Sequence, residues 1–557
     1  MGHAELSSKS VLEALLKTNR PPTDQETAII RESMALINAK LKGVEAHISE
    51  MIAHIQELKA QVEQAETKLR CLREEEASIL ETLADHRRIF SPFRNLPDDV
   101  LLDIFAACVE GEIPTLSFHV TPLPYTLAQI SRGIRRIVLA TPSIWASINI
   151  RTDFSSIDEV SADIKPYSIL AAKAIEWLER AGGMSLTVYM QDPSFPCLSL
   201  LDPERSDPSC ILFDTLLLYS ARWKHIQFES TCIVRTLSAP LLRISALMAA
   251  DVPLLESISL RFQSGASAFR NSPLLLIPTL KRLELNTNWA DVSNPHCVVV
   301  SEFTVSWAIL TSITIHADSY FHVSSVGAIA MILRQTKCLV FCDIAVGPGQ
   351  GESQGEISLP WLKVLRLAEG MFAVTPSGAA SILDLINAPI LATLILPEPS
   401  LKISVSKFLK RTPNVQELSL SHFRTEGALT DISELLRHCP SLSVLSLRAA
   451  PWPTAESSFD GNRFLRAFVD DDGAGVTCPH LQYFECAGKI TFTLQTLRQF
   501  LQAKHRAGIP PPNCLSPWKR VAIDMSGISE LETHQQMLDL VSQEQAMGLD
   551  IYAHVKD

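Results

Sequence analysis

The chain lacks several features that would assign it to a special class of protein. Its 557 residues contain no uninterrupted apolar run of membrane-spanning length, and the N-terminal MGHAELSSKS lacks the apolar core of a signal peptide. The net charge of −12, without a domain-sized basic stripe, argues against a broad nucleic-acid-binding surface. We therefore expect an intracellular protein, cytoplasmic or nuclear, with neither nucleic acid nor membrane as a partner.

Motifs of catalytic and metal sites are scarce as well. The 12 cysteines and 15 histidines show no zinc-ligand spacing, and KCLVFC, with Cys338 and Cys342, is typical of a buried strand. GPGQGESQG from Gly347 lacks the Lys-Ser/Thr of a phosphate loop, and DDDG from Asp470 lacks the ligand spacing of a calcium loop. We interpret both segments as surface loops and expect no metal, no cofactor and no enzymatic activity.

The first folded segment that the sequence predicts is a long helix over residues 23 to 88. Residues 1 to 22, which precede it, are expected to be a disordered N-terminus. Thr23 and Glu26 have the spacing of a capping box, in which each side chain bonds the other residue's backbone N–H. The sequence therefore predicts that the helix starts at this point.

Apolar residues recur along this segment at alternating steps of four and three, from Ile30 to Leu83, and only Glu76 interrupts them. A repeat of 3.5 residues sustained over about eight heptads is typical of a left-handed coiled coil. In the resulting heptad register Met34 occupies an a position. The alternative is a solitary helix that packs on the chain's own body.

The charges that flank the apolar stripe leave its partner open. In a parallel dimer Lys40 and Glu45 would attract each other, whereas Lys68 and Arg73 would repel each other. Self-association or a partner helix through residues 30–83 is expected, and antiparallel and heteromeric pairing both stay open.

A short and strongly apolar helix follows in FRNLPDDVLLDIF. Pro97, Asp98 and Asp99 suit a first helical turn, which tolerates a missing N–H donor and favours negative charge. The apolar residues after them cover more than one face, so we expect burial on two sides, by the chain's own domain and by a second surface. These residues are Val100, Leu101, Ile104, Phe105 and Cys108.

A second amphipathic helix is predicted within YTLAQISRGIRRIVLATPSIWASINI. Its apolar stripe would comprise Leu127, Ile130, Ile134, Ile137 and Val138.

LPDDVLLDIF, a gap and LAQISRGIRRIVLATPSIWASI together resemble an F-box, the small helical module that binds the Skp adaptor of cullin-RING ubiquitin ligases. The resemblance covers about residues 89 to 150. The alternative is an ordinary three-helix packing unit that binds no adaptor. Two departures from the family are Ile130-Ser131, where Val-Cys is usual, and Ile134, where Trp is usual. The resemblance implies a set of adaptor-facing and core positions: Leu96, Pro97, Val100, Leu101, Ile104, Phe105, Ile130, Ile134 and Trp145.

Residues 151 to 220 resemble the linking segment that follows the F-box in a large fungal group of such proteins. The stretches that carry this second resemblance are IEWLERAGGMSLTVYM and LLLYSARWKHIQF, and they extend the match to about Phe228.

Residues 221 to 557 repeat one template, a proline followed by apolar residues two, five and seven positions later. The period of about 26 residues and the L-x-x-L-x-L core predict an irregular leucine-rich-repeat-like solenoid with a parallel sheet, in an α/β fold. The interval from Ala308 to Pro360 should hold one degenerate copy; the alternative is an unrepeated α/β domain. Clear copies begin at Pro253, Pro278, Pro360, Pro389, Pro413, Pro440 and Pro479, and weaker ones at Ala221, Ala308 and Ser516.

The resemblance implies a substrate receptor of a Skp-cullin-F-box type ubiquitin ligase, whose F-box binds the adaptor and whose repeats bind an unknown target protein. The alternative function is a non-catalytic coiled-coil scaffold in which the F-box-like helices only cap the repeats. Side chains alternate along a strand, so residues between the apolar positions should face outward, where a target would bind. Such residues are Glu256, Ser257, Lys281, Arg282, Glu284, Lys363, Arg366, Gln416, Glu417, Ser419, Ser443 and Ser446.

Overall fold

The structure, a computed structural model, divides the chain into two compact units, Met1–Val100 and Leu101–Asp557. The described residues are 8–90, 96–152, 164–191, 209–230, 239–262, 269–286, 303–316, 325–347, 355–369, 381–397, 403–423, 432–433, 435–449, 459–469, 478–488, 490–503, 516–524, 531–546 and 548–554.

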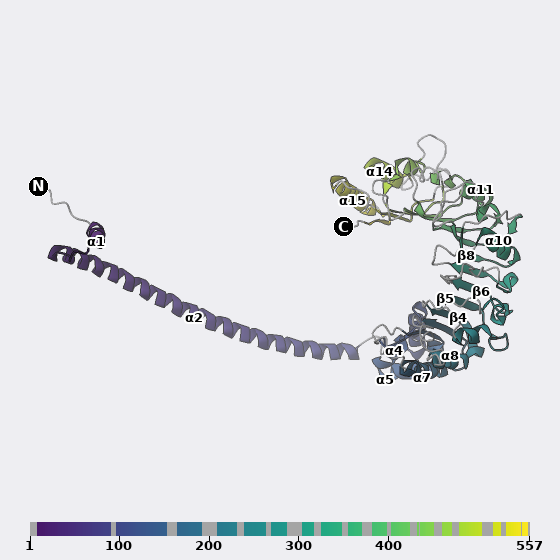
Figure 1. Cartoon of the computed structure of the whole chain (residues 1–557), viewed down its shortest axis with the longest axis horizontal. Helices are drawn as coiled ribbons and strands as arrows, with labels where there is room; N and C mark the ends of the chain where they lie inside the picture. Colours follow the sequence, from purple (N-terminus) through teal and green to yellow (C-terminus); the bar gives the residue numbers. More distant parts are fainter. Residues whose placement is uncertain are drawn as a thin grey trace. The chain divides into compact units, whose positions relative to one another are not determined.

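The first unit contains the predicted long helix. Helix α2 (Asp24–Ile89) is continuous over 66 residues, and α1 (Ser8–Leu16) precedes it within the segment expected to be disordered. Figure 1 shows α2 as one unbroken rod with α1 folded back beside its start. Val11 of α1 is buried, whereas almost all of α2 is exposed.

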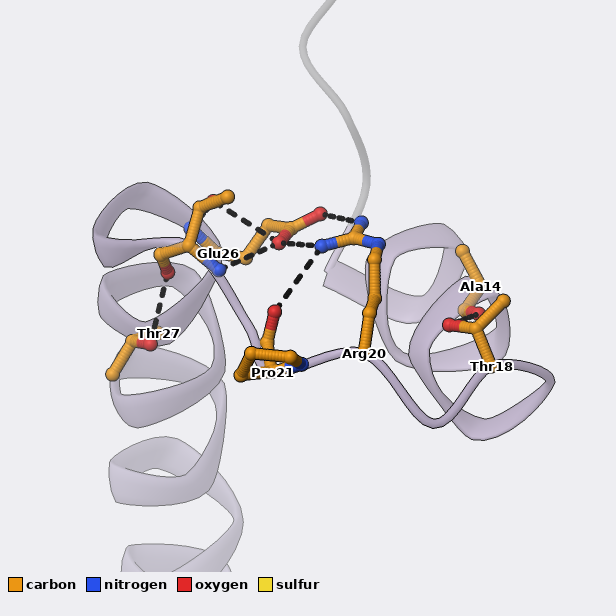
Figure 2. Close-up of polar contacts among 7 residues, drawn as sticks. Ala14, Thr18, Arg20, Pro21, Glu26 and Thr27 are labelled. Carbon is orange, nitrogen blue, oxygen red and sulfur yellow. Dashed lines mark hydrogen bonds and ion pairs between the residues drawn. The ribbon is translucent and has the colours of Figure 1, made fainter.

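The start of α2 is fixed by the predicted capping box, which the structure confirms. The backbone N–H of Thr23 donates to Glu26 Oε2 at 2.9 Å, and the N–H of Glu26 donates to Thr23 Oγ1 at 3.4 Å. Arg20, in the turn between the two helices, donates from Nη1 and Nη2 to the two oxygens of Glu26 at 2.8 and 2.6 Å (Figure 2). One carboxylate therefore holds both the helix end and the turn before it.

The second unit is built on one 15-stranded sheet in which every strand is parallel to its neighbours, which confirms the α/β class and the parallel sheet. The strands follow one another in chain order, as the labels β4, β5, β6 and β8 in Figure 1 illustrate. They are β1 (Thr115–Leu116), β2 (Ser147–Arg151), β3 (Leu186–Gln191), β4 (Trp223–Ser230), β5 (Ser257–Phe262), β6 (Arg282–Asn286), β7 (Ser312–His316), β8 (Phe341–Val346), β10 (Val364–Glu369), β12 (Thr393–Leu396), β13 (Glu417–Phe423), β14 (Val444–Ala449), β16 (Tyr483–Ala487), β18 (Arg520–Asp524) and β19 (Ile551–His554).

Helices and short turns connect these strands, and two small two-stranded parallel sheets accompany them, β9 (Ile357–Ser358) with β11 (Ile386–Asn387), and β15 (Phe459–Asp460) with β17 (Ile490–Thr491). The helices are α3 (Asp98–Gly111), α4 (Leu123–Ile130), α5 (Arg132–Ala140), α6 (Pro142–Trp145), α7 (Ile164–Arg180), α8 (Ser209–Leu217), α9 (Ala239–Ser245), α10 (Val326–Gln335), α11 (Ile403–Arg411), α13 (Asn462–Arg466), α14 (Leu494–Gln502) and α15 (Leu531–Ala546). The 3₁₀ turns are Ser220–Arg222, Pro273–Leu276, Trp307–Ile309 and Ile382–Asp384.

The repeated template forms the core of this unit. The apolar residues two, five and seven positions after each template start are buried in all ten copies predicted from the sequence. The middle positions line up across the sheet as one buried row, because the strands pair in register. This row is Ile148, Val188, Ile226, Ile258, Leu283, Ile313, Cys342, Leu365, Leu394, Leu418, Leu445, Phe484, Val521 and Ile551.

The degenerate copy expected between Ala308 and Pro360 corresponds to β8. Leu339, Cys342 and Ile344 occupy its apolar positions and are buried. The same spacing also occurs earlier in the chain, where Trp145, Ile148 and Ile150 are buried around β2. The sheet is thus continuous across residues 150 and 220, where the sequence suggested boundaries between the F-box-like module, the linking segment and the repeats.

The second amphipathic helix is not one helix, which corrects the expectation for the segment after Tyr125. Helix α4 ends at Ile130, and Ser131 has an extended backbone, with φ −157° and ψ 164°. Its Oγ accepts from the N–H of Ile134 at 3.2 Å and so caps α5, while Pro142 starts the short α6. The chain therefore turns inside the predicted stripe.

Candidate protein-interaction surfaces

Helix α3 has one buried face in the second unit. Leu101, Phe105 and Val109 recur every four residues and are buried there. Ile104, on a neighbouring face, is only half-buried, and Cys108 is exposed. The helix thus presents apolar surface beyond what its own unit covers.

The remaining residues that the resemblance singled out divide into buried and exposed positions. Ile134 and Trp145 are buried, together with Leu101 and Phe105, whereas Ile130 is 58% exposed because α4 ends there. At the start of α3, Leu96 is half-buried and Pro97 and Val100 are exposed. The set therefore contains core residues as well as residues that a partner could contact.

Trp145 occupies the centre of an aromatic cluster that its sequence position did not reveal. Its indole Nε1 donates to the carbonyl oxygen of Val138 at 2.8 Å, and its ring centroid lies 4.8 Å from that of Trp177 and 5.3 Å from that of Tyr125. Burial, with a contribution from nearby Glu176, raises the pKa of the Tyr125 hydroxyl. These edge-to-face contacts join α4, α6 and α7 into one body.

Arg180, at the end of α7, completes this cluster. Its guanidinium carbon lies 4.7 Å from the Trp145 ring centroid, its Nη1 donates to the Tyr125 hydroxyl at 3.1 Å, and its Nη2 pairs with Glu176. A planar cation on an aromatic face is a stabilising arrangement. No sequence motif linked Arg180 to Trp145, because the two residues are far apart in the chain.

The outward face of the sheet carries polar and charged side chains between the buried positions. None of the twelve residues predicted to face outward is buried, and seven of them lie within strands. Glu284, Arg366, Ser419 and Ser446 belong to one row of strand partners that also contains Asp343 and Glu485. The structure thus brings the expected outward residues onto one surface.

Ion pairs between adjacent strands cross this face. Asp343 lies 3.3 Å from His316 Nε2 and 3.7 Å from Arg366 Nε, and its side chain is only 10% exposed. Elsewhere Arg261 Nε donates to Glu284 at 2.9 Å. Asp343 could not be assigned from the sequence, because the degenerate copy that contains it has no proline to mark its register. His316 lies one position beyond the last apolar residue of the Ala308 copy.

A cavity of about 580 Å³ opens at the start of the outward face. Its lining combines three carboxylates with one guanidinium and a phenol, from the end of α3 and from β2 to β4. Gln191 Nε2 donates to Glu229 at 3.4 Å across it. Its polar lining residues include Glu110, Glu112, Arg151, Tyr189, Gln191 and Glu229.

Helix α2 carries the most extensive apolar surface among the described residues. The large apolar side chains at the a and d positions are between 43% and 59% exposed, from Met34 to Leu83. At the helix start Ile29 and Ile30 are half-buried, where α1 packs on α2. The uncovered set is Met34, Ile37, Leu41, Val44, Ile48, Met51, Ile55, Leu58, Val62, Leu69, Leu72, Ile79 and Leu83, which we call the heptad stripe.

The cysteines around β8 differ in their exposure to solvent. Cys342 is fully buried in β8, and burial raises the pKa of its thiol; burial likewise raises the pKa of Cys439 to about 12. Cys338, which precedes β8, is exposed. Within the described ranges, no three His, Cys, Asp or Glu side chains gather to form a metal site. The GPGQGESQG and DDDG segments lie almost wholly outside the described residues.

None of the helices described by the structure has both the length and the apolar character that a membrane span requires. Comparison with models of protein families finds none that matches the chain, and comparison with curated proteins finds no match either. The F-box resemblance therefore depends on the sequence motifs alone.

Proposed function

We propose that the chain is a non-catalytic substrate receptor of a Skp-cullin-F-box type ubiquitin ligase. Residues 89 to 150 would bind a Skp-type adaptor, which connects the chain to a cullin. The strands that follow would form an irregular leucine-rich-repeat-like solenoid, and its outward face would hold a target protein. Other subunits would then catalyse ubiquitin transfer, and this chain would hold the target protein close to them.

The observation that carries this proposal is the division of apolar residues in the helical module. Leu101 and Phe105 are buried in the core, whereas Ile104 is half-buried and Ile130 is 58% exposed. Apolar side chains left uncovered on two helices are typical of a binding surface, and an adaptor helix would cover them. The solenoid part is supported by the parallel strands in chain order and their repeated buried positions.

Binding of a purified Skp-type adaptor to the full chain, measured by calorimetry, tests the adaptor role. Ile130→Asp should weaken binding at least tenfold, because a charge placed in an apolar interface must be desolvated. Leu218→Asp is the matched control, since Leu218 is 79% exposed and lies outside the helical module. Absence of binding by the folded wild-type chain at micromolar adaptor would refute the proposal.

The alternative is a coiled-coil scaffold without a role in ubiquitin transfer, and the heptad stripe is the observation that favours it. In a scaffold the helical module only caps the sheet, so the chain would associate through α2 and would leave the adaptor unbound.

A further inference from the structure

We propose that the heptad stripe of α2 is covered by the α2 helix of a second copy of this chain, in antiparallel orientation. The inference does not depend on the adaptor role. Three properties of the described residues carry it: the area of the stripe, the length of helix needed to cover it, and the charges along its seam.

The area of the stripe matches one side of a stable interface. Roughly 60 Å² of apolar surface remains to be covered on each half-exposed aliphatic side chain. The heptad stripe then presents about 800 Å² on one helix, which is what each partner buries in a standard-size interface. Water-exposed apolar surface on this scale marks an interaction site.

The length of the stripe selects the kind of partner. At about 1.5 Å per residue, Met34 to Leu83 spans about 75 Å, and a 3.5-residue repeat requires another helix of similar length. Among the described residues of the first unit, α1 packs on α2 over the first turns of α2. Among the described helices of the second unit the longest is α7, with 17 residues. Within this chain's own described elements, only another α2 is long enough.

The a and d positions of two antiparallel α2 helices match over the whole stripe. With the two helices fully overlapped, Met34 meets Ile79 of the second copy, and Leu41 meets its Leu72. At the centre Ile55 meets Leu58 of the second copy. These layers bury the same exposed side chains on both helices, as a symmetric dimer requires.

Glu76, the polar residue that interrupts the apolar a and d positions, decides between the parallel and the antiparallel orientation. In a parallel pair in register Glu76 meets Glu76 of the second copy, and two like charges must then be desolvated side by side. In the antiparallel pair Glu76 meets Ile37 instead.

The flanking charges balance in both orientations. The antiparallel pair sets Lys40 against Glu75 of the second copy and Glu45 against its Glu66. Two attractive contacts on one side of the interface are thus offset by two repulsive contacts on the other. A parallel pair has an equal balance, because its attraction between Lys40 and Glu45 is offset by repulsion between Lys68 and Arg73. The Glu76 layer therefore gives the antiparallel pair its advantage.

Sedimentation equilibrium of the full chain tests the interface. We expect a dimer at micromolar concentration, and we expect Leu58→Glu, in the middle of the stripe, to weaken it at least a hundredfold. Ala60→Glu is the matched control, because Ala60 lies on the opposite face of the same helix and should leave the dimer intact. A monomeric wild type, or a dimer that survives Leu58→Glu, would overturn the proposal; in the first case a different protein covers the stripe.

A charge swap tests the orientation. Lys40→Glu should weaken the dimer roughly tenfold, since two attractive pairs become repulsive, and adding Glu75→Lys should restore it. In a parallel pair Glu75 meets Leu80, so the second substitution would not restore association. Failure of the double variant to recover would overturn the antiparallel arrangement. Helicity measured by circular dichroism confirms that each variant still folds.

Discussion

The guanidinium of Arg180 lies 4.7 Å from the ring centroid of Trp145, at the junction between the helical module and the first strands of the sheet. Trp145 occupies the first apolar position of the template around β2, and Arg180 ends α7, which precedes β3. One cation thus connects α4 and α6 to α7, the helix that leads into β3.

Arg180→Ala should lower the free energy of unfolding by about 1–2 kcal/mol, because it removes the stacking contact and the bond to Tyr125. Arg180→Lys retains the charge but not the planar fork, so it should recover less than half of the loss. Chemical denaturation of the full chain measures both. Equal stability of all three proteins would show that the contacts of Arg180 contribute nothing to stability.

For the adaptor surface, combined Leu96→Ala and Ile104→Ala substitutions should weaken adaptor binding by about 3 kcal/mol in total, as expected for interface anchors. Leu218→Ala, at an exposed residue outside the module, should leave binding unchanged. Titration of the purified full-length variants with the adaptor gives the two affinities. Unaltered affinity of the double variant would mean that the adaptor binds elsewhere on the chain.

Leu418 and Glu417 are adjacent in β13 but face opposite sides of the sheet. Leu418 is fully buried, whereas the half-buried Glu417 accepts from Thr393 Oγ1 at 3.1 Å. Leu418→Asp should cost about 4 kcal/mol, because it buries a charge among apolar neighbours, whereas Glu417→Lys should cost less than about 1 kcal/mol.

Thermal melts and limited proteolysis compare these two variants. Each strand pairs with its neighbours in chain order. Leu418→Asp should therefore make the C-terminal strands sensitive to protease before residues 89 to 150 become sensitive. Similar damage from both substitutions would contradict the alternation of buried and outward residues in this strand.

The capping box of Thr23 and Glu26, together with the bonds from Arg20, should become less stable in acid. The bond from Arg20 is the main cause that lowers the pKa of Glu26 to about 2, from an ordinary value of 4.5. A carboxyl group with a lowered folded-state pKa stabilises above the unfolded-state pKa and loses that contribution as the pH falls. The start of α2 should therefore loosen between about pH 4.5 and pH 2.

Hydrogen exchange of the peptide that contains Thr23 and Glu26, corrected for intrinsic rates, follows this loosening. Glu26→Gln cannot ionise, so its exchange should show no transition in this pH range. A wild-type profile without a transition would mean that the Glu26 carboxylate does not stabilise the start of α2 in solution.

Local patterns were sufficient to predict much of this fold. The capping box and the heptad spacing predicted α2, and the proline template predicted the buried row of the parallel sheet, because each depends on residues close together in sequence. The break at Ser131 escaped prediction for a physical reason. Leu127, Ile130 and Ile134 keep helical spacing through the cap, so periodicity alone cannot reveal that the chain turns there.

The candidate surfaces were less predictable, because they depend on contacts between residues that are distant in sequence. The pairing of Asp343 with His316 and Arg366 requires the strand register of β7, β8 and β10. The position of Arg180 on Trp145 likewise requires the packing of α6 against α7. The sequence marked the outward residues as a class but gave no means of ranking them.

The agreement between the order of strands in the sheet and their order in the chain has a consequence for synthesis. As each strand of the 15-stranded sheet leaves the ribosome, the strand with which it will pair has already been made. The sheet can therefore grow from β1 toward β19 while translation continues, and no strand has to wait for a partner from the far end of the chain. At any moment during synthesis, the unpaired edges of the growing sheet are those of β1 and of the newest strand.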